Sequence, residues 1–71
     1  MMFIELRRIE YYSGRYNSAP ALFALSEISR VITCTDDSSY TNIITKDGKK
    51  HTIADQYENV KKKIREALEK T

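Results

Sequence analysis

Cysteine and histidine are almost absent from this chain of 71 residues. Cys34 is the only cysteine and His51 the only histidine. A single cysteine excludes an intrachain disulfide, and one residue of each type is too few for a structural zinc site, which takes four such ligands. We therefore expect no metal and no cofactor, and the low use of cysteine suits a reduced, cytoplasmic setting.

Long apolar runs are absent as well. The longest spans residues 21–25, far short of the roughly 20 residues that a membrane helix needs. The first residues show no basic segment followed by an apolar one, so we expect no secretory signal and no membrane partner. The two glycines, Gly14 and Gly48, are isolated, which excludes a glycine-rich phosphate loop.

Charge of either sign is not concentrated in any one segment. The net charge is +2, from 12 basic and 10 acidic residues. Dedicated nucleic-acid binders usually carry a denser basic patch. The chain is expected to form one domain, residues 1–71, and a domain of this size buries only about 60% of its unfolded surface. We therefore predict that the protein acts as a homo-oligomer.

Alternating apolar residues predict strands from residue 2 to residue 53. In the first strand, residues 2–12, the alternation changes phase at Arg7-Arg8. A β-bulge at that point would keep all the apolar side chains on one face. The alternative is that Ile9 and Tyr11 face the other way and meet a partner chain.

Turn-forming residues separate the strands. Residues 13–20 contain Ser, Gly, Asn and Pro and are predicted to form a loop. Asp36 and Asp37 are interpreted as part of a polar turn, where they help Ser38-Ser39 to form hydrogen bonds with the backbone, and the alternative is a weak divalent-metal site. Asp47-Gly48 is typical of a type I′ hairpin turn. Further strands are predicted at residues 21–25, 30–35, 40–45 and 50–53.

An amphipathic helix is predicted at about residues 55–69. Asp55 is placed to cap its first turn and Glu58 to reach back, as in a capping box. One apolar stripe, expected to face the sheet, contains Tyr57, Val60, Ile64, Ala67 and Leu68. The sequence therefore predicts an α+β fold: a small antiparallel β-meander of four or five strands over residues 2–53, with one C-terminal α-helix.

The order of these features is similar to that in known small bacterial proteins. The likeness rests on Ile4-Glu5-Leu6, Leu25-Ser26-Glu27-Ile28, the strand and turn at residues 43–50, and the helix start at residues 57–64. On these residues the chain resembles the FlbD-type flagellar accessory proteins, and it departs from them in the Tyr- and Arg-rich residues 11–20. Residues 28–68 also resemble the core of LytTR DNA-binding domains, which implies a nucleic-acid-binding regulator.

No arrangement of residues indicates an enzyme. Nucleophilic catalysis would need Cys34 beside His51. Cys34 alternates with Ile32 and is predicted to point into the core, where a free cysteine behaves as a small hydrophobic residue. His51 is interpreted as a packed or surface imidazole, and we predict no catalytic residue.

Tyrosine and arginine are concentrated near the start of the chain. Both residue types are enriched at protein-binding hot spots, and both can stack on bases or contact phosphates. The alternative is that Tyr11 packs in the core and the rest forms a solvated hairpin tip. The candidate binding residues are Arg7, Arg8, Tyr11, Tyr12, Arg15, Tyr16 and Asn17.

Two hypotheses of function follow. The first is a non-enzymatic binding or regulatory module that forms a homo-oligomer and binds a host protein or an anionic, nucleotide-like ligand. A phage-encoded inhibitor of a host enzyme, or a sponge for a host nucleotide signal, is one form of this hypothesis. The alternative is a nucleic-acid-binding transcriptional regulator of the LytTR-like type.

Overall fold

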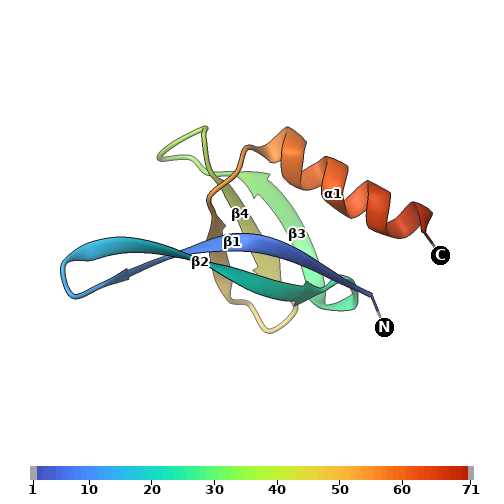
Figure 1. Cartoon of the computed structure of the whole chain (residues 1–71), viewed down its shortest axis with the longest axis horizontal. Coiled ribbons are helices and arrows are strands. Elements are labelled where there is room, and N and C mark those ends of the chain that lie inside the picture. Colours follow the sequence, from blue (N-terminus) through green and yellow to red (C-terminus); the bar gives the residue numbers. More distant parts are fainter. Residues whose placement is uncertain (1, 71) are drawn as a thin grey trace.

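Five antiparallel strands and one α-helix make up the computed structural model, which describes residues 2–70 (Figure 1). Their order across the sheet is β2-β1-β5-β4-β3, so β3, β4 and β5 form a meander and β5 pairs back onto β1. This confirms the predicted α+β fold with a C-terminal helix. The elements are β1 (Phe3–Tyr12), β2 (Arg15–Ala24), a 3-10 helix η1 (Leu25–Glu27), β3 (Ile28–Thr33), β4 (Thr41–Thr45), β5 (Lys50–Ile53) and α1 (Tyr57–Glu69).

The β1–β2 hairpin is much longer than predicted. The predicted loop at residues 13–20 is wrong, because β2 begins at Arg15 and only Ser13 and Gly14 form the turn. Both turn residues have positive φ, 54° and 73°, which is the conformation of a type I′ turn. That turn has a twist that matches the twist of the two flanking strands. Cross-strand pairing therefore overrides the loop-forming tendency of the residues after Gly14.

Pro20 lies inside β2, opposite Arg7. β2 is an edge strand, and proline is tolerated on an edge strand where its missing N–H would face solvent. The hydrogen bond from Ala54 N to Arg7 O, 2.8 Å long, shows that the backbone of Arg7 faces β5 rather than β2. Pro20 is therefore at a position where β1 needs no hydrogen bond from it.

The tip of this hairpin extends beyond the rest of the protein as an arm, defined here as residues 10–17. The β1–β5 pairing includes only Arg8 and Ile9 of β1, so the arm strands pair with one another alone. Figure 1 shows the arm as the ribbon that projects on the left. The arm makes the molecule elongated, with extents of 41 × 21 × 20 Å.

The predicted bulge at Arg7-Arg8 is also wrong. The register of β1 with β2 is continuous from the Phe3–Ala24 pair to the Tyr12–Arg15 pair. Ile9 and Tyr11 therefore lie on the opposite side of the ribbon from Leu6. A register shift occurs instead in β3, between Ile28 and Arg30. This irregularity lets both Ile28 and Val31 pack against the core.

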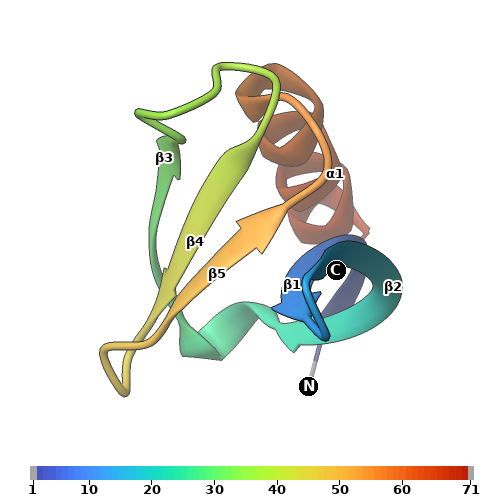
Figure 2. The same ribbon diagram turned by 90° about the vertical axis from the view of Figure 1, so that its left-hand side faces the viewer.

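The core lies between the sheet and α1. Among residues 2–70 its buried apolar side chains are Ile4, Leu6, Phe23, Ile43, Ile53 and Val60. Figure 2, which looks toward the tip of the arm, shows α1 on one side of the curved β3-β4-β5 layer. Each such side chain contributes about 1.5–3 kcal/mol by burial, so any one of them is a large fraction of the stability of a small domain. No helix in this part of the chain is both long and apolar enough to cross a membrane.

The Asp47-Gly48 turn differs from the type I′ turn that was predicted. Gly48 has a φ of 86°, whereas Asp47 does not have positive φ. Gly48 N donates to Thr45 O (2.9 Å), and Thr45 N donates to Lys49 O (3.0 Å). This is a three-residue hairpin loop that ends in a left-handed glycine. The Asp47 carboxylate accepts the Lys49 N–H (3.2 Å), which holds the loop in this form.

The predicted capping box is not formed. The N-cap residue of α1 is Gln56, and its side chain makes no capping hydrogen bond. Asp55 Oδ1 instead accepts from Gln56 N (2.9 Å) and from Asn59 Nδ2 (2.8 Å). The Glu58 carboxylate lies 3.9 Å from Lys61 Nζ rather than reaching back to the first turn of the helix. Asp55 is one residue too early in the chain to act as the cap.

Candidate functional site

The arm and its base carry all the residues that were predicted to bind. Side chains alternate between the two sides of a strand, and the register pairs Tyr11 with Tyr16 and Tyr12 with Arg15. One side, the outer face of the sheet, lies away from α1. It holds Arg7, Tyr11 and Tyr16, whereas the other side holds Arg8, Tyr12, Arg15 and Asn17. The structure therefore does not bring the three arginines together.

The outer face is hollowed where the arm meets the β3–β4 loop. This hollow, the outer groove, has a volume of about 430 Å³. The Tyr11 and Tyr16 rings stand at one side of it, with their centroids 5.0 Å apart and their planes tilted by 59°. The residues that line the outer groove are Ile9, Tyr11, Tyr16, Cys34, Asp36, Asp37, Tyr40 and Thr52.

The β3–β4 loop supplies the other side of the outer groove. Asp37 organises this loop, because its carboxylate accepts the Ser39 N–H (2.9 Å) and its carbonyl accepts the Tyr40 N–H (3.0 Å). Cys34 N in turn donates to Tyr40 O (3.1 Å). These bonds confirm that Asp37 stabilises a polar turn. Among residues 2–70, neither Asp36 nor Asp37 forms an ion pair.

Cys34 does not point into the core, as the sequence suggested. It is half-buried and lines the outer groove. Val31 packs against the core, and the alternation of side chains then places Ile32 and Cys34 on the other face of β3 and its extension. Ile32 is accordingly exposed. Ile32 and Cys34 share one face, as predicted, but it is the outer face and not the core face.

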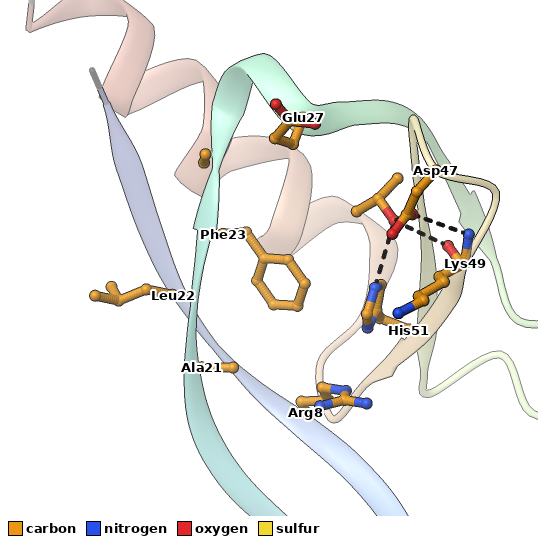
Figure 3. Close-up of a pocket in the computed structure, with 10 residues that line it drawn as sticks. Arg8, Ala21, Leu22, Phe23, Glu27, Asp47, Lys49 and His51 are labelled. Atoms are coloured by element: carbon orange, nitrogen blue, oxygen red, sulfur yellow. Dashed lines mark hydrogen bonds between the residues drawn. The ribbon is translucent and has the colours of Figure 1, made fainter.

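A second pocket lies between β2 and the β4–β5 hairpin, with a volume of about 370 Å³. Figure 3 shows Phe23 of β2 and His51 of β5 facing one another across it, while Leu22 points away. The two rings meet edge to face, with centroids 5.3 Å apart and planes at 74°. This confirms that His51 is a packed imidazole. We call this space the His51 pocket.

The electrostatics of the His51 pocket favour a neutral imidazole. Burial, followed by the charge of Arg8, lowers the pKa of His51, and the Asp47 carboxylate opposes this shift only in part. The Nδ1 atom is buried without a hydrogen-bond partner in the described part of the chain. The pKa of Asp47 is lowered as well, first by the Thr45 hydroxyl and then by the Lys49 N–H.

The hydrogen bonds in the His51 pocket are connected differently from those of a catalytic triad. In a triad, the carboxylate bonds to the imidazole, which then accepts the proton of the hydroxyl. Here the Thr45 hydroxyl donates to Asp47 Oδ1 and lies 3.5 Å from His51 Nε2. The hydroxyl proton is therefore directed at Asp47 rather than at His51. Cys34 and His51 line different pockets.

Comparisons with known proteins found no relative. No family model matches the chain, and neither a curated protein nor a solved structure matches it. The resemblance to FlbD-type proteins and to LytTR domains therefore stays a prediction from the sequence. Within residues 2–70, no group of three or more His, Cys, Asp or Glu side chains is arranged to hold a metal ion.

Only Tyr11 and Tyr16 of the outer groove were among the predicted binding residues. The residues that were missed include three from the β3–β4 loop with polar or aromatic side chains: Asp36, Asp37 and Tyr40. The sequence does place a tyrosine shortly after two aspartates in a polar turn. Nothing in that spacing links the turn to Tyr11 and Tyr16. The link depends on the pairing of Ile9 with Thr52, which sets β1 in the same sheet as β4 and β5.

Proposed function

We propose that this protein is a non-enzymatic binding module that recognises another protein through the outer side of its arm. The observation that carries the proposal is the exposure of Tyr11 and Tyr16, which share the outer side of a ribbon that pairs with no other strand. Tyr11 is 66% exposed and Tyr16 is 78% exposed, while Tyr12, on the other side of the ribbon, is 66% exposed. Tyrosines are frequent hot-spot residues, since they bury a large area and keep a hydroxyl for hydrogen bonding.

A protein partner fits the charges around the arm better than an anionic ligand does. The arginines lie on opposite sides of the ribbon, and Arg8 is engaged by Glu10 at 2.7 Å. The carboxylates of Asp36 and Asp37 lie in the same groove as Tyr11 and Tyr16, and they would repel a phosphate. These features weigh against the nucleotide-like ligand that the sequence suggested.

The same features weigh against a nucleic-acid-binding regulator. The basic residues 61–65 of α1 are preceded by Glu58 and followed by Glu66 and Glu69, so they form a short cluster and not a long basic stripe. Binding to mixed DNA and RNA can be measured by electrophoretic mobility shift at two salt concentrations. Tight binding that weakens steeply with salt would favour the regulator over our proposal.

Self-association in the cytoplasm is part of the proposal. The small core supports self-association, since a domain of this size buries little of its surface. The free, half-buried thiol of Cys34 supports a reducing compartment such as the cytoplasm. Native mass spectrometry of the protein from a gentle lysate reports the number of copies and any retained ligand together. A monomer at micromolar concentration would remove the homo-oligomer from the proposal, and a retained nucleotide would replace the protein partner.

Site-specific photocrosslinking tests the arm as the binding surface. A photoreactive benzoylphenylalanine replaces Tyr16 in one sample and Lys62, an exposed residue of α1, in the control. The purified proteins are illuminated in a lysate of cells that produce the natural protein. We expect one discrete crosslinked protein from position 16 that is absent from position 62.

Competition makes this experiment specific. Excess unlabelled natural protein should remove the crosslink, and the Tyr11→Ala variant should need at least about a tenfold higher concentration to do so. The proposal is wrong if positions 16 and 62 give the same products, or if Tyr11→Ala competes as well as the natural protein. A phage-encoded inhibitor of a host protein is one form of the proposal, and the identity of the crosslinked protein would decide that point.

A further inference from the structure

We propose that the outer groove binds a cationic side chain, an arginine or a lysine, of the protein partner. This inference rests on the proposed function, and it names the chemistry that the partner presents. The sequence predicted that the candidate binding residues bind either a protein or an anionic ligand. The groove that actually contains two of them, Tyr11 and Tyr16, offers aromatic rings and carboxylates instead.

The aromatic side of the groove suits a cation. Tyr11 and Tyr16 are paired across the arm, with ring centroids 5.0 Å apart, and Tyr40 lines the groove from the β3–β4 loop. A guanidinium or ammonium group near the face of a tyrosine ring is attracted by the electrons of the ring. An arginine side chain is attracted more strongly to such a site, because its planar guanidinium group also stacks on aromatic rings.

The carboxylates of the groove have no cation beside them among residues 2–70. Asp36 and Asp37 are adjacent in sequence, and neither forms an ion pair in residues 2–70. Asp37 is held by its bond to the Ser39 N–H, 2.9 Å long, so its position is set before any partner arrives. A carboxylate that is already placed can accept charge-assisted hydrogen bonds from a guanidinium group.

The apolar lining of the groove explains why a side chain fits better than a free metal ion. Ile9 lines the groove beside the tyrosines, and the methylene groups of a long basic side chain pack well on apolar surface. A hard cation such as Ca²⁺ needs six to eight oxygen ligands. The aromatic and aliphatic residues that make up much of this groove do not supply them.

The test uses the full chain and two small probes, acetyl-arginine amide and acetyl-citrulline amide. The second probe has nearly the same shape and no charge. Two-dimensional NMR spectra are recorded during each titration, and the signals of Tyr11, Tyr16, Tyr40 and Asp36 are followed. We expect the arginine probe to shift these signals in a saturable way, and the citrulline probe to bind at least about fivefold more weakly.

Two double variants separate local charge from net charge. Asp36→Asn with Asp37→Asn keeps an oxygen that can accept the Ser39 N–H, and it should weaken the arginine probe about five- to tenfold. Glu58→Gln with Glu69→Gln removes the same amount of charge from α1, which lies on the other side of the sheet from the groove, and should leave the affinity for the arginine probe unchanged. Equal binding of both probes, equal effects of both double variants, or signal shifts that lie elsewhere would overturn the inference.

A second copy of this chain is another occupant that the same samples can reveal. If the Asp36→Asn, Asp37→Asn variant turns a dimer into a monomer in sedimentation experiments, an arginine of the second copy occupies the groove. That result would overturn the proposal that the cationic side chain in the groove belongs to a different protein.

The failure of this inference can be told apart from the failure of the proposed function. If the crosslink from position 16 is specific but the arginine probe does not bind, the arm still recognises a protein and the groove does not take a cation. If the probe binds but position 16 gives no specific crosslink, the groove binds cations and the arm is not the protein-binding surface.

Discussion

The β1–β2 and β4–β5 hairpins both turn at a glycine with positive φ, but their strands have different neighbours. In the β4–β5 hairpin, each strand has a second neighbour, β3 on one side and β1 on the other. Ile43 and Ile53 of this hairpin are fully buried. In the arm of the β1–β2 hairpin the strands have no second neighbour, and every residue from 10 to 17 is exposed.

The difference shows that exposure of the arm tyrosines results from topology rather than from hydrophobicity. Tyr11 belongs to the same alternating series as Ile9, which is half-buried. The sheet extends beside Ile9 because Thr52 pairs with it, and it has already ended beside Tyr11. The β4–β5 hairpin is therefore enclosed in the sheet, while the arm stays exposed. Four predictions test this comparison.

The largest difference is expected between a core residue of one hairpin and a tip residue of the other. Ile43→Ala should lower the free energy of unfolding by about 2–5 kcal/mol, because it leaves a cavity in the core. Tyr16→Ala should change it by less than about 0.5 kcal/mol, since that ring is mostly exposed. Urea unfolding followed by circular dichroism measures both. If Ile43→Ala does not fold, Ile43→Val provides a smaller change of about 0.5–1.5 kcal/mol.

The two glycines should also differ. A Cβ atom at Gly14 or Gly48 would meet nothing within 4 Å, so an alanine acts only through the left-handed backbone. Gly48→Ala should destabilise the whole fold by about 1–2 kcal/mol. Gly14→Ala should have a smaller effect on global unfolding, because the arm can open locally.

Amide hydrogen exchange separates these two effects. We expect Gly14→Ala to reduce protection only in residues 10–17, and Gly48→Ala to reduce it throughout the sheet. Equal losses of protection across the sheet in both variants would show that the arm unfolds together with the body, which is the part of the protein outside residues 10–17.

The His51 pocket should make the stability of the body depend on pH. The pKa of His51 is lowered in the folded state by burial and by Arg8. At pH values below about 6.5, the ordinary pKa of histidine, the unfolded chain therefore binds more protons than the folded chain does. The contribution of His51 to stability is therefore complete above about pH 6.5 and is lost as the pH falls through the folded pKa.

The measurement is the urea midpoint at pH 7.5 and at pH 5.5. We expect a lower midpoint at pH 5.5, and a smaller decrease in the His51→Gln variant. Asp47 does not interfere, because its pKa is lowered from a value near 3.8 and it stays ionised over this range. An unchanged pH dependence in His51→Gln would show that other groups cause it.

The smallest effect is expected at the turn of the arm. Ser13 has a φ of 54°, a conformation that asparagine adopts more readily, and Asn-Gly is a preferred type I′ pair. Ser13→Asn should therefore stabilise the arm by a few tenths of a kcal/mol. Slower amide exchange at residues 10–17, with an unchanged urea midpoint, is the expected outcome, and an unchanged exchange rate would contradict it.

The sequence predicted the elements of the body better than those of the arm. The strand at 50–53 agrees with β5, the strand at 40–45 nearly agrees with β4, and the helix at 55–69 begins two residues later, at Tyr57. Periodicity and β-branched residues act locally, so they identify such segments. The composition of residues 15–20 favours turns and predicts a loop, whereas pairing with β1 makes them a strand.

The seven candidate binding residues illustrate the same limit. Their concentration of tyrosine and arginine could be read directly from the sequence. Their division between two sides of the ribbon follows from the Tyr11–Tyr16 register, which depends on where the turn lies. A turn at Ser13-Gly14 rather than a loop of eight residues changes which side chains are neighbours.

By itself, the sequence determined that this is a small α+β domain with a final amphipathic helix, and that its tyrosines gather near the start of the chain. These properties follow from side-chain periodicity and composition, which act over a few residues. Only the tertiary structure decided that β5 pairs with β1 and that the arm extends beyond that pairing. The same pairing brings Tyr11 and Tyr16 to Asp36, Asp37 and Tyr40, because contacts between distant segments depend on how the whole core packs.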